Sequence, residues 1–201
     1  MPFPGRRGAP VDWLVVGLGN PGTEYAGTRH NVGFEVANML ASRWALPKAK
    51  IKYRGLLTEG RTGPGRARVA VLLPQTYMNE AGASVGPARG AFKLPLERVL
   101  VIHDEIDLPF GEIRTRIGGG LAGHNGLRSL KQGLGSSEFR RLRVGVGRPA
   151  STDPEVVSTY VLGRFAEQRE QVAELVERAA DEAERLILDS GLDASQPSSA
   201  R

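Results

Sequence analysis

Continuous apolar runs alternate along this chain with segments in which apolar residues recur at helical spacing. Residues 13–18 and 99–102 are almost wholly apolar, which indicates strands buried on both faces of a sheet. Between 32 and 44 the apolar positions follow a helical period, and this helix should end by Pro47. The same criteria predict strands at 51–53, 67–73, 112–117 and 142–146, and helices at 79–92, 125–134 and 172–187.

Strands that alternate with helices indicate an α/β protein. We expect a single three-layer domain at residues 11–190, with a twisted, mixed, mostly parallel sheet and helices on both faces. The Pro- and Gly-rich residues 1–10 lack the apolar core of a signal peptide and are expected to form a flexible extension. The polar residues 191–201 are expected to form a disordered tail. No run approaches the roughly 18 apolar residues that cross a membrane.

Charge is distributed unevenly along the chain. Residues 1–150 carry 22 Lys and Arg against 11 Asp and Glu, whereas residues 151–201 carry 5 against 11. A basic body followed by an acidic C-terminal segment favours a polyanion as partner of the body. The chain has no cysteine, which excludes disulfides, thiolate metal sites and a cysteine nucleophile.

Residues 15–31, VVGLGNPGTEYAGTRHN, contain the glycine spacing of a dinucleotide-binding loop directly after a predicted strand. In such loops a helix begins at the third glycine and faces the pyrophosphate. Here the residues after Gly22 are polar, and helical spacing begins only at Val32. The glycine match is therefore weak, and we do not expect a nucleotide cofactor.

Polar residues instead follow the predicted strand ends. Asn20 follows the first strand, Asp104 closes the strand that begins at residue 99, and Asn79 follows the strand at 67–73. His30 begins the helix behind the first strand. Open α/β sheets carry functional groups beyond the carboxyl ends of their strands, so these side chains are expected to meet at one edge. A His–Asp pair can activate water, because the carboxylate orients the imidazole and stabilises its protonated form.

These residues occur in blocks that closely resemble the bacterial peptidyl-tRNA hydrolase family. The blocks are GLGNPGTEYAGTRHNVGFEV, PQTYMNEAGASV, HDEIDLPFGEIRTRIGGGLAGHNGLRS, FRRLRVGVGRP and YVLGRF. They follow the family order and span nearly all of residues 13–187. The resemblance implies an enzyme that cleaves the ester between a peptide, or an N-blocked amino acid, and the 3′ ribose of tRNA. Free tRNA then returns to translation.

The resemblance also implies a role for each matching residue. His30 would be the general base that activates water, and Asp104 would orient it. Asn20 would support the site near the scissile bond, and Asn79 would grip the peptide main chain or serve the oxyanion. The remaining substrate contacts would be made by Asn125, Met78, Tyr25, Arg114 and Arg116. Among these, Asn125 and Met78 would contact the peptide, Tyr25 the 3′ end of tRNA, and the two arginines a phosphate.

The implied reaction needs no cofactor and no metal. The expected partner is peptidyl-tRNA, held by its acceptor stem and 3′ CCA end, and we expect a cytoplasmic monomer without a membrane partner. Leu121 and Ala122 stand where relatives often carry His and Gly, and this difference is expected to reshape the loop before Asn125. The role of His124 then has two alternatives, which are support of the catalytic residues and packing in the core. His103 should point away from Asp104, because side chains alternate along a strand.

Two other functions remain compatible with the residues. A metallohydrolase could use His30, His103, Asp104 and His124, although closely spaced ligand pairs are missing from the sequence. A catalytically silent RNA-binding protein could share the fold, although the complete set of candidate catalytic residues argues against it.

Overall fold

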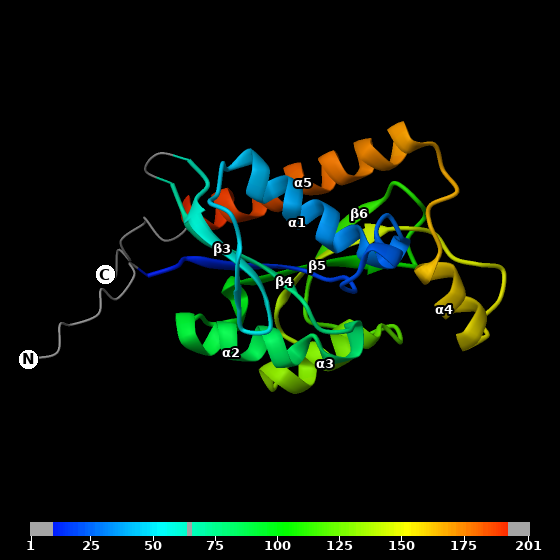
Figure 1. The fold of residues 1–201 in the computed structure, drawn as a ribbon, viewed down its shortest axis with the longest axis horizontal. Coiled ribbons are helices and arrows are strands. Elements are labelled where there is room, and N and C mark those ends of the chain that lie inside the picture. Colours follow the sequence, from blue (N-terminus) through cyan, green and yellow to red (C-terminus); the bar gives the residue numbers. More distant parts are fainter. Residues whose placement is uncertain (1–9, 64–65, 193–201) are drawn as a thin grey trace, which may run out of the picture.

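The computed structural model describes residues 10–63 and 66–192 and has three layers, with a mixed sheet between two pairs of helices (Figure 1). The strands are β1 (Trp13–Gly17), β2 (Lys50–Lys52), β3 (Gly55–Arg61), β4 (Arg68–Pro74), β5 (Val99–Glu105), β6 (Ile113–Ile117) and β7 (Arg140–Gly145). The helices are α1 (Val32–Arg43), α2 (Gly82–Phe92), α3 (Asn125–Leu134), α4 (Pro154–Leu162) and α5 (Arg169–Leu192). The predicted α/β class and three-layer architecture are confirmed.

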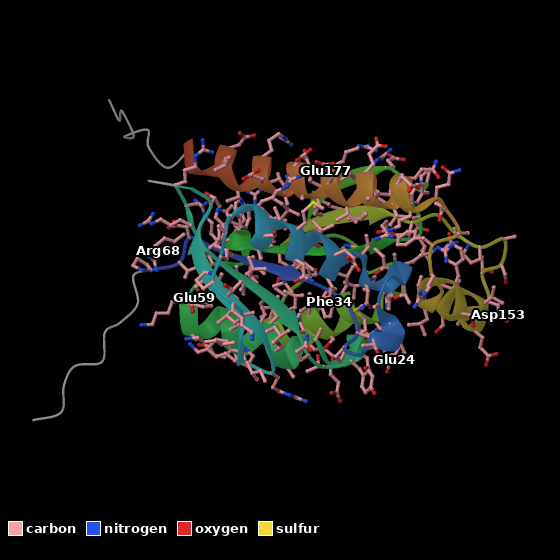
Figure 2. All side chains as sticks on the ribbon, turned by 45° about the horizontal axis from the view of Figure 1, so that its top comes forward. Glu24, Phe34, Glu59, Arg68, Asp153 and Glu177 are labelled. Carbon is pink, nitrogen blue, oxygen red and sulfur yellow. The ribbon has the colours of Figure 1, made fainter. Side chains whose placement is uncertain are left out.

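The seven strands lie in the order β2-β3-β4-β1-β5-β7-β6. The four central strands β4, β1, β5 and β7 run parallel to one another, whereas the pairs at the two edges are antiparallel. The carboxyl ends of β4, β1, β5 and β7 therefore meet at one end of the sheet. In Figure 2, Asp153 before α4 and Arg68 at the start of β4 lie at opposite ends of the molecule, so α4 stands beyond those carboxyl ends.

Each face of the sheet has its own hydrophobic core. One core lies under α1 and α5, where Val15, Ile102 and Ala180 are fully buried. The other lies under α2 and α3, where Val16, Val101 and Leu130 are fully buried. Neighbouring strand residues enter opposite cores, because side chains alternate across a sheet. The central strands thus owe their continuous apolar sequence to helices on both faces.

The structure differs from the sequence prediction at three elements. β3 was not predicted, and it lies between the strands predicted at 51–53 and 67–73. Its sequence GLLTEGR is half polar and contains two glycines, so its strand form depends on pairing with β2 and β4. The helix predicted from Asn79 begins at Gly82, after a 3₁₀ turn η3 (Met78–Glu80). α4 was not predicted either, because little of it is buried and its apolar pattern is weak.

The predicted chain ends fall largely outside the described residues. Residues 1–9 and 193–201 are not described, so the extension and the tail stay predictions. α5 runs to Leu192 and so passes the predicted domain boundary at residue 190. Among the described residues, no helix is both long and apolar enough to span a membrane.

A close approach between α1 and the sheet positions the segment that carries His30. A Cβ added to Gly33 would lie 2.3 Å from the Ile102 carbonyl oxygen and 2.6 Å from that of Leu18. Only a residue without a side chain lets the start of α1 rest on the ends of β1 and β5. The 3₁₀ turn η2 (Arg29–Asn31), which precedes α1, is thereby held beside the end of β5.

We expect Gly33→Ala to destabilise the protein by about 1–3 kcal/mol, because the added methyl forces α1 away from two backbone carbonyls. The control is Gly90→Ala in α2, where no atom lies within 4 Å of an added Cβ. This change should stabilise the protein by about 0.5–1 kcal/mol, since Ala loses less entropy in a helix. Urea denaturation of both variants measures the difference. Equal stability of the two variants would contradict this account of α1.

Candidate active site

A cleft of about 840 Å³ opens at the carboxyl ends of the central strands. Its floor includes Asn20, His30 and Asp104, which come from the segments after β1, before α1 and at the end of β5. The loop before α3 and the turn η3 form one side, and α4 forms the opposite wall. The groups that the sequence assigns to one edge of the sheet are therefore brought together.

His30 and Asp104 form a buried pair at the floor of this cleft. Nδ1 of His30 lies 2.9 Å and 3.0 Å from the two carboxylate oxygens of Asp104, so it donates its hydrogen to them. The remaining ring nitrogen, Nε2, is left for a molecule in the cleft. Burial lowers the pKa of His30, but the charge of Asp104 and the hydrogen bond outweigh it and raise the pKa above 6.5.

His124 is the second histidine on the same carboxylate. Its Nε2 lies 2.9 Å from Oδ1 of Asp104, and its Nδ1 accepts hydrogen bonds from the backbone N–H groups of Gly126 and Leu127 at 3.1 and 3.4 Å. Because Nδ1 accepts, the ring hydrogen must sit on Nε2 and point at Asp104. His124 therefore caps α3 and supports the His30–Asp104 pair at the same time, which resolves the open prediction in favour of a supporting contact.

Asp104 stays ionised within this arrangement. Burial raises the pKa of its carboxyl group, whereas charge on His30 and His124 and their hydrogen bonds lower it well below 3.8. One ligand atom each from His30, Asp104 and His124 would lie within 4.8 Å of the others, so this trio could also hold a metal ion. The same atoms already form the hydrogen bonds described above.

His103 lies on the opposite face of β5, as strand alternation predicts. Its Nδ1 is 2.7 Å from the backbone oxygen of Asp104 and donates to it, and its ring contacts that of His124 edge-on. Burial and the charge of His124 lower the pKa of His103 to about 3, so this ring is neutral. His103 packs beneath the site and does not line the cleft.

Asn20 is held by a pair of hydrogen bonds to Asn31. The backbone N–H of Asn20 donates to Oδ1 of Asn31, and Nδ2 of Asn31 donates to the Asn20 carbonyl, both at 2.9 Å. Oδ1 of Asn20 accepts from the backbone N–H of Met78 at 2.7 Å. Only the Nδ2 donor of Asn20 is then available to a ligand. Asn31 was not singled out from the sequence, although it adjoins His30 in the quoted motif.

The other predicted peptide contacts also border the cleft. Met78 is buried there, whereas Asn79 and Asn125 are exposed at its edge. Oδ1 of Asn125 accepts a long hydrogen bond of 3.4 Å from Arg128. Cleft residues that the sequence did not indicate are Tyr77, Arg128, Arg148 and the apolar residues of α4. Most of them lie within the quoted sequence blocks, but no local signal assigns them to the cleft, because their positions there depend on how distant segments pack.

The loop before α3 contains the Leu121–Ala122 departure. Leu121 packs against the core under α2 and α3, and its carbonyl accepts a hydrogen bond of 2.8 Å from the backbone N–H of His124. Ala122 has φ 46°, in the left-handed region that favours glycine. The loop thus forms a tight turn that delivers His124 to α3, at some cost in backbone strain.

Tyr25, Arg114 and Arg116 do not line the cleft. Tyr25 ends the 3₁₀ turn η1 (Thr23–Tyr25) and is half-buried. Arg114 and Arg116 are exposed on β6, where they pair in register with Arg143 and Arg141 of β7. Residues directly opposite on paired strands share a face, so four arginines form one row, which we call the arginine row.

Like charges in the arginine row repel one another. Burial lowers the pKa of Arg141, and the charges of Arg116 and Arg143 lower it further. Glu105 pairs with Arg143 at 3.0 Å, and Glu112 pairs with Arg114. Among the residues that the structure describes, Arg116 forms no ion pair. The row therefore retains positive charge that an anion would neutralise.

An α/β sheet with a buried His–Asp pair at the floor of an open cleft is an arrangement in which histidine can activate water, as it does in one class of hydrolases. A family model described as peptidyl-tRNA hydrolase matches residues 14–200. The chain is 49% identical over 185 residues to the peptidyl-tRNA hydrolase of Mycobacterium sp. (strain KMS), covering 91% of this chain and 94% of that protein. It is 46% identical over 175 residues to that of Geobacillus kaustophilus (strain HTA426), covering 87% and 92%.

A crystal structure of peptidyl-tRNA hydrolase from Acinetobacter baumannii matches with a TM-score of 0.79 and 37% identity, covering 93% of this chain and 94% of that one. The chain therefore belongs to the peptidyl-tRNA hydrolase family. The family resemblance inferred from the sequence is confirmed.

The three histidines should be distinguishable by NMR. We expect His30 to titrate above pH 6.5, because Asp104 stabilises its protonated form, and His103 to stay neutral down to a pH near its pKa of about 3. Neutral His124 should be the Nε2–H tautomer, because its Nδ1 accepts hydrogen bonds. Long-range ¹H–¹⁵N spectra across a pH series report all three. In Asp104→Asn the pKa of His30 should fall, and an unchanged value would contradict the assigned pairing.

Proposed function

We propose that this chain hydrolyses the ester bond of peptidyl-tRNA with His30 as general base and Asp104 as its orienting partner. The proposed reaction rests on membership of the peptidyl-tRNA hydrolase family, and one structural observation supports the roles given to His30 and Asp104. Nδ1 of His30 donates to a buried carboxylate, which leaves Nε2 for a molecule in the cleft.

Water is the attacking group in this proposal. Nε2 of His30 takes a proton from a water molecule while the water oxygen attacks the ester carbonyl carbon. The bond between that carbon and the ribose O3′ then breaks. The proton then passes to the departing O3′, so that free peptide and free tRNA result. Asp104 holds the ring in the Nδ1–H tautomer and stabilises the imidazolium that forms. His124 fills a further acceptor position of Asp104 and keeps the carboxylate in place.

The amides of the cleft would bind the acyl group and the developing negative charge. Nδ2 is the group of Asn20 that remains for substrate, since its Oδ1 accepts from Met78. Asn79 would donate to the oxyanion or the peptide backbone, and Asn125 would hold the peptide from the start of α3. Met78 would form a flexible apolar wall against the peptide side chains.

The arginine row would bind the tRNA part of the substrate. Arg114 and Arg116 would contact phosphates of the acceptor stem, because these two side chains are exposed on β6 and the row has excess positive charge, whereas Arg141 is buried. Tyr25 would lie near the 3′ CCA end. We further propose a cytoplasmic monomer whose catalytic domain comprises residues 11–190.

Metal-dependent hydrolysis is the second candidate, because His30, Asp104 and His124 lie close enough to share an ion. Such a site would replace the ring hydrogens that now point at Asp104. Chelation separates the two proposals. Hydrolysis by the His–Asp pair should be indifferent to EDTA, whereas a metal-dependent reaction should lose its activity.

The central experiment compares N-acetylated and free aminoacyl-tRNA as substrates, with and without EDTA. We expect turnover of the N-acetylated form alone. His30→Ala should reduce kcat by about 10²–10⁴-fold, the usual contribution of a general base. Binding of tRNA to the variant should stay unchanged, which separates lost chemistry from lost folding. Turnover that persists in His30→Ala would overturn the assigned base.

The salt dependence of tRNA binding tests the arginine row. Arg116→Ala should weaken binding and reduce the slope of log K against log salt by about one, because one phosphate contact is lost. Arg114→Ala should have a smaller effect, since Glu112 already neutralises part of its charge. Arg185→Ala on α5 is the matched control, because Arg185 pairs with Glu182 and Asp189 away from the row. Identical slopes for all three variants would exclude the row from tRNA binding.

A further inference from the structure

Arg29 is a buried cation whose role the reaction chemistry leaves unexplained. It directly precedes His30 in the turn η2, and its side chain is 8% exposed. Its Nη1 donates to the backbone oxygens of Arg164 at 2.7 Å, Tyr160 at 3.2 Å and Gly163 at 3.5 Å. All three oxygens lie in the last turn of α4 or just after it. Arg29 thus caps the C-terminal end of a helix that lies far away in the sequence.

The surroundings of the guanidinium suit a permanent positive charge. The guanidinium carbon lies 4.0 Å from the ring centre of Tyr160 and 5.6 Å from that of Phe165, and Nη2 lies 3.9 Å from a carboxylate oxygen of Glu167. A cation is also favoured at a helix C-terminus by the helix dipole. Together these contacts attach Arg29 to the C-terminal end of α4.

α4 has few other attachments to the rest of the molecule. Of its own residues only Val161 is buried. The Tyr160 hydroxyl donates to the Val146 carbonyl at 2.7 Å, and the backbone N–H of Arg29 donates to the Gly163 carbonyl at 3.0 Å. The position of α4 therefore depends largely on the segment that also carries His30.

α4 is at the same time the apolar wall of the cleft. Val157, Val161 and Leu162 face the cleft that His30 and Asp104 line from below. Neighbouring residues thus have complementary tasks, since His30 points to Asp104 while Arg29 holds the wall opposite. A shift of α4 would change the width of the cleft above the catalytic pair without breaking the pair itself.

We propose that Arg29 is a positioning residue that fixes α4 at the distance from His30 at which the cleft holds the acyl group of the substrate. This inference rests on the proposed role of His30 and adds an acyl-specificity function to its neighbour. Release of α4 weakens binding of substrates with large apolar acyl groups, which contact the wall. Substrates with a small acyl group are affected little.

The test compares Arg29→Met with the control Arg43→Met, which removes an arginine that also links two helices. Arg43 joins α1 to α5 through Asp181 at 2.6 Å and does not line the cleft. Arg29→Lys is the milder variant, since it keeps the charge but has no planar fork for several carbonyls. Hydrogen exchange of the backbone amides of residues 154–162 reports the attachment of α4. Kinetics with N-acetyl-leucyl-tRNA and N-acetyl-glycyl-tRNA report the acyl preference.

In Arg29→Met we expect faster exchange in α4 and an increase of about tenfold in KM for the leucyl substrate, equivalent to ~1.4 kcal/mol. The glycyl substrate should change by less than about twofold, and the pH dependence of kcat should be retained, because the His30–Asp104 pair stays intact. Arg29→Lys should have an exchange rate in α4 and a KM for the leucyl substrate between those of the parent protein and Arg29→Met. Arg43→Met should show none of these effects on α4 or on KM.

Three results would overturn the proposal. One is an unchanged rate of amide hydrogen exchange in α4 of Arg29→Met, and another is an equal increase in KM for the leucyl and glycyl substrates. The third is a fall in kcat with a shifted pH profile, which would mean that Arg29 acts on His30 itself. The exchange measurement does not depend on which residue is the base. It therefore remains decisive even if His30→Ala retains activity and the proposed mechanism fails.

Discussion

The site depends on the hydrogen bonds that the buried carboxylate of Asp104 accepts from two histidines. Asp104 is 2% exposed and accepts hydrogen bonds from His30 and His124, which lie 74 and 20 residues away in the sequence. A buried carboxylate without partners costs several kcal/mol, so the turn before α1 and the start of α3 must both close on the end of β5. Folding and assembly of the site therefore require the same contact.

The fold supplies this contact through close backbone approaches. Gly33 lets α1 rest on the ends of β1 and β5, and the paired amides of Asn20 and Asn31 join the segment after β1 to the turn that carries His30. Asn20 in turn holds the backbone of Met78. The floor of the cleft is consequently assembled from the ends of β1, β4 and β5 and the turn before α1, and hydrogen bonds from neighbouring groups orient its polar side chains.

The walls of the cleft are built differently from its floor. α4 buries little surface and is attached at its C-terminal end, where Arg29, Tyr160 and the Gly163 carbonyl meet. The loop opposite contains Ala122 in a left-handed conformation. The floor is held by side-chain hydrogen bonds among its own polar groups, whereas the position of the α4 wall depends on the few contacts at the C-terminal end of the helix.

The sequence by itself determined the α/β class, the central strands and the edge at which Asn20, His30 and Asp104 meet, because continuous apolar runs and strand-end motifs are local signals. Tertiary structure alone decided that His124 shares the carboxylate of Asp104, that Arg29 holds α4, and that the half-polar residues of β3 form a strand. Each of these depends on a partner distant in the sequence. Local periodicity carries no information about such partners, since their pairing is fixed only when the layers pack.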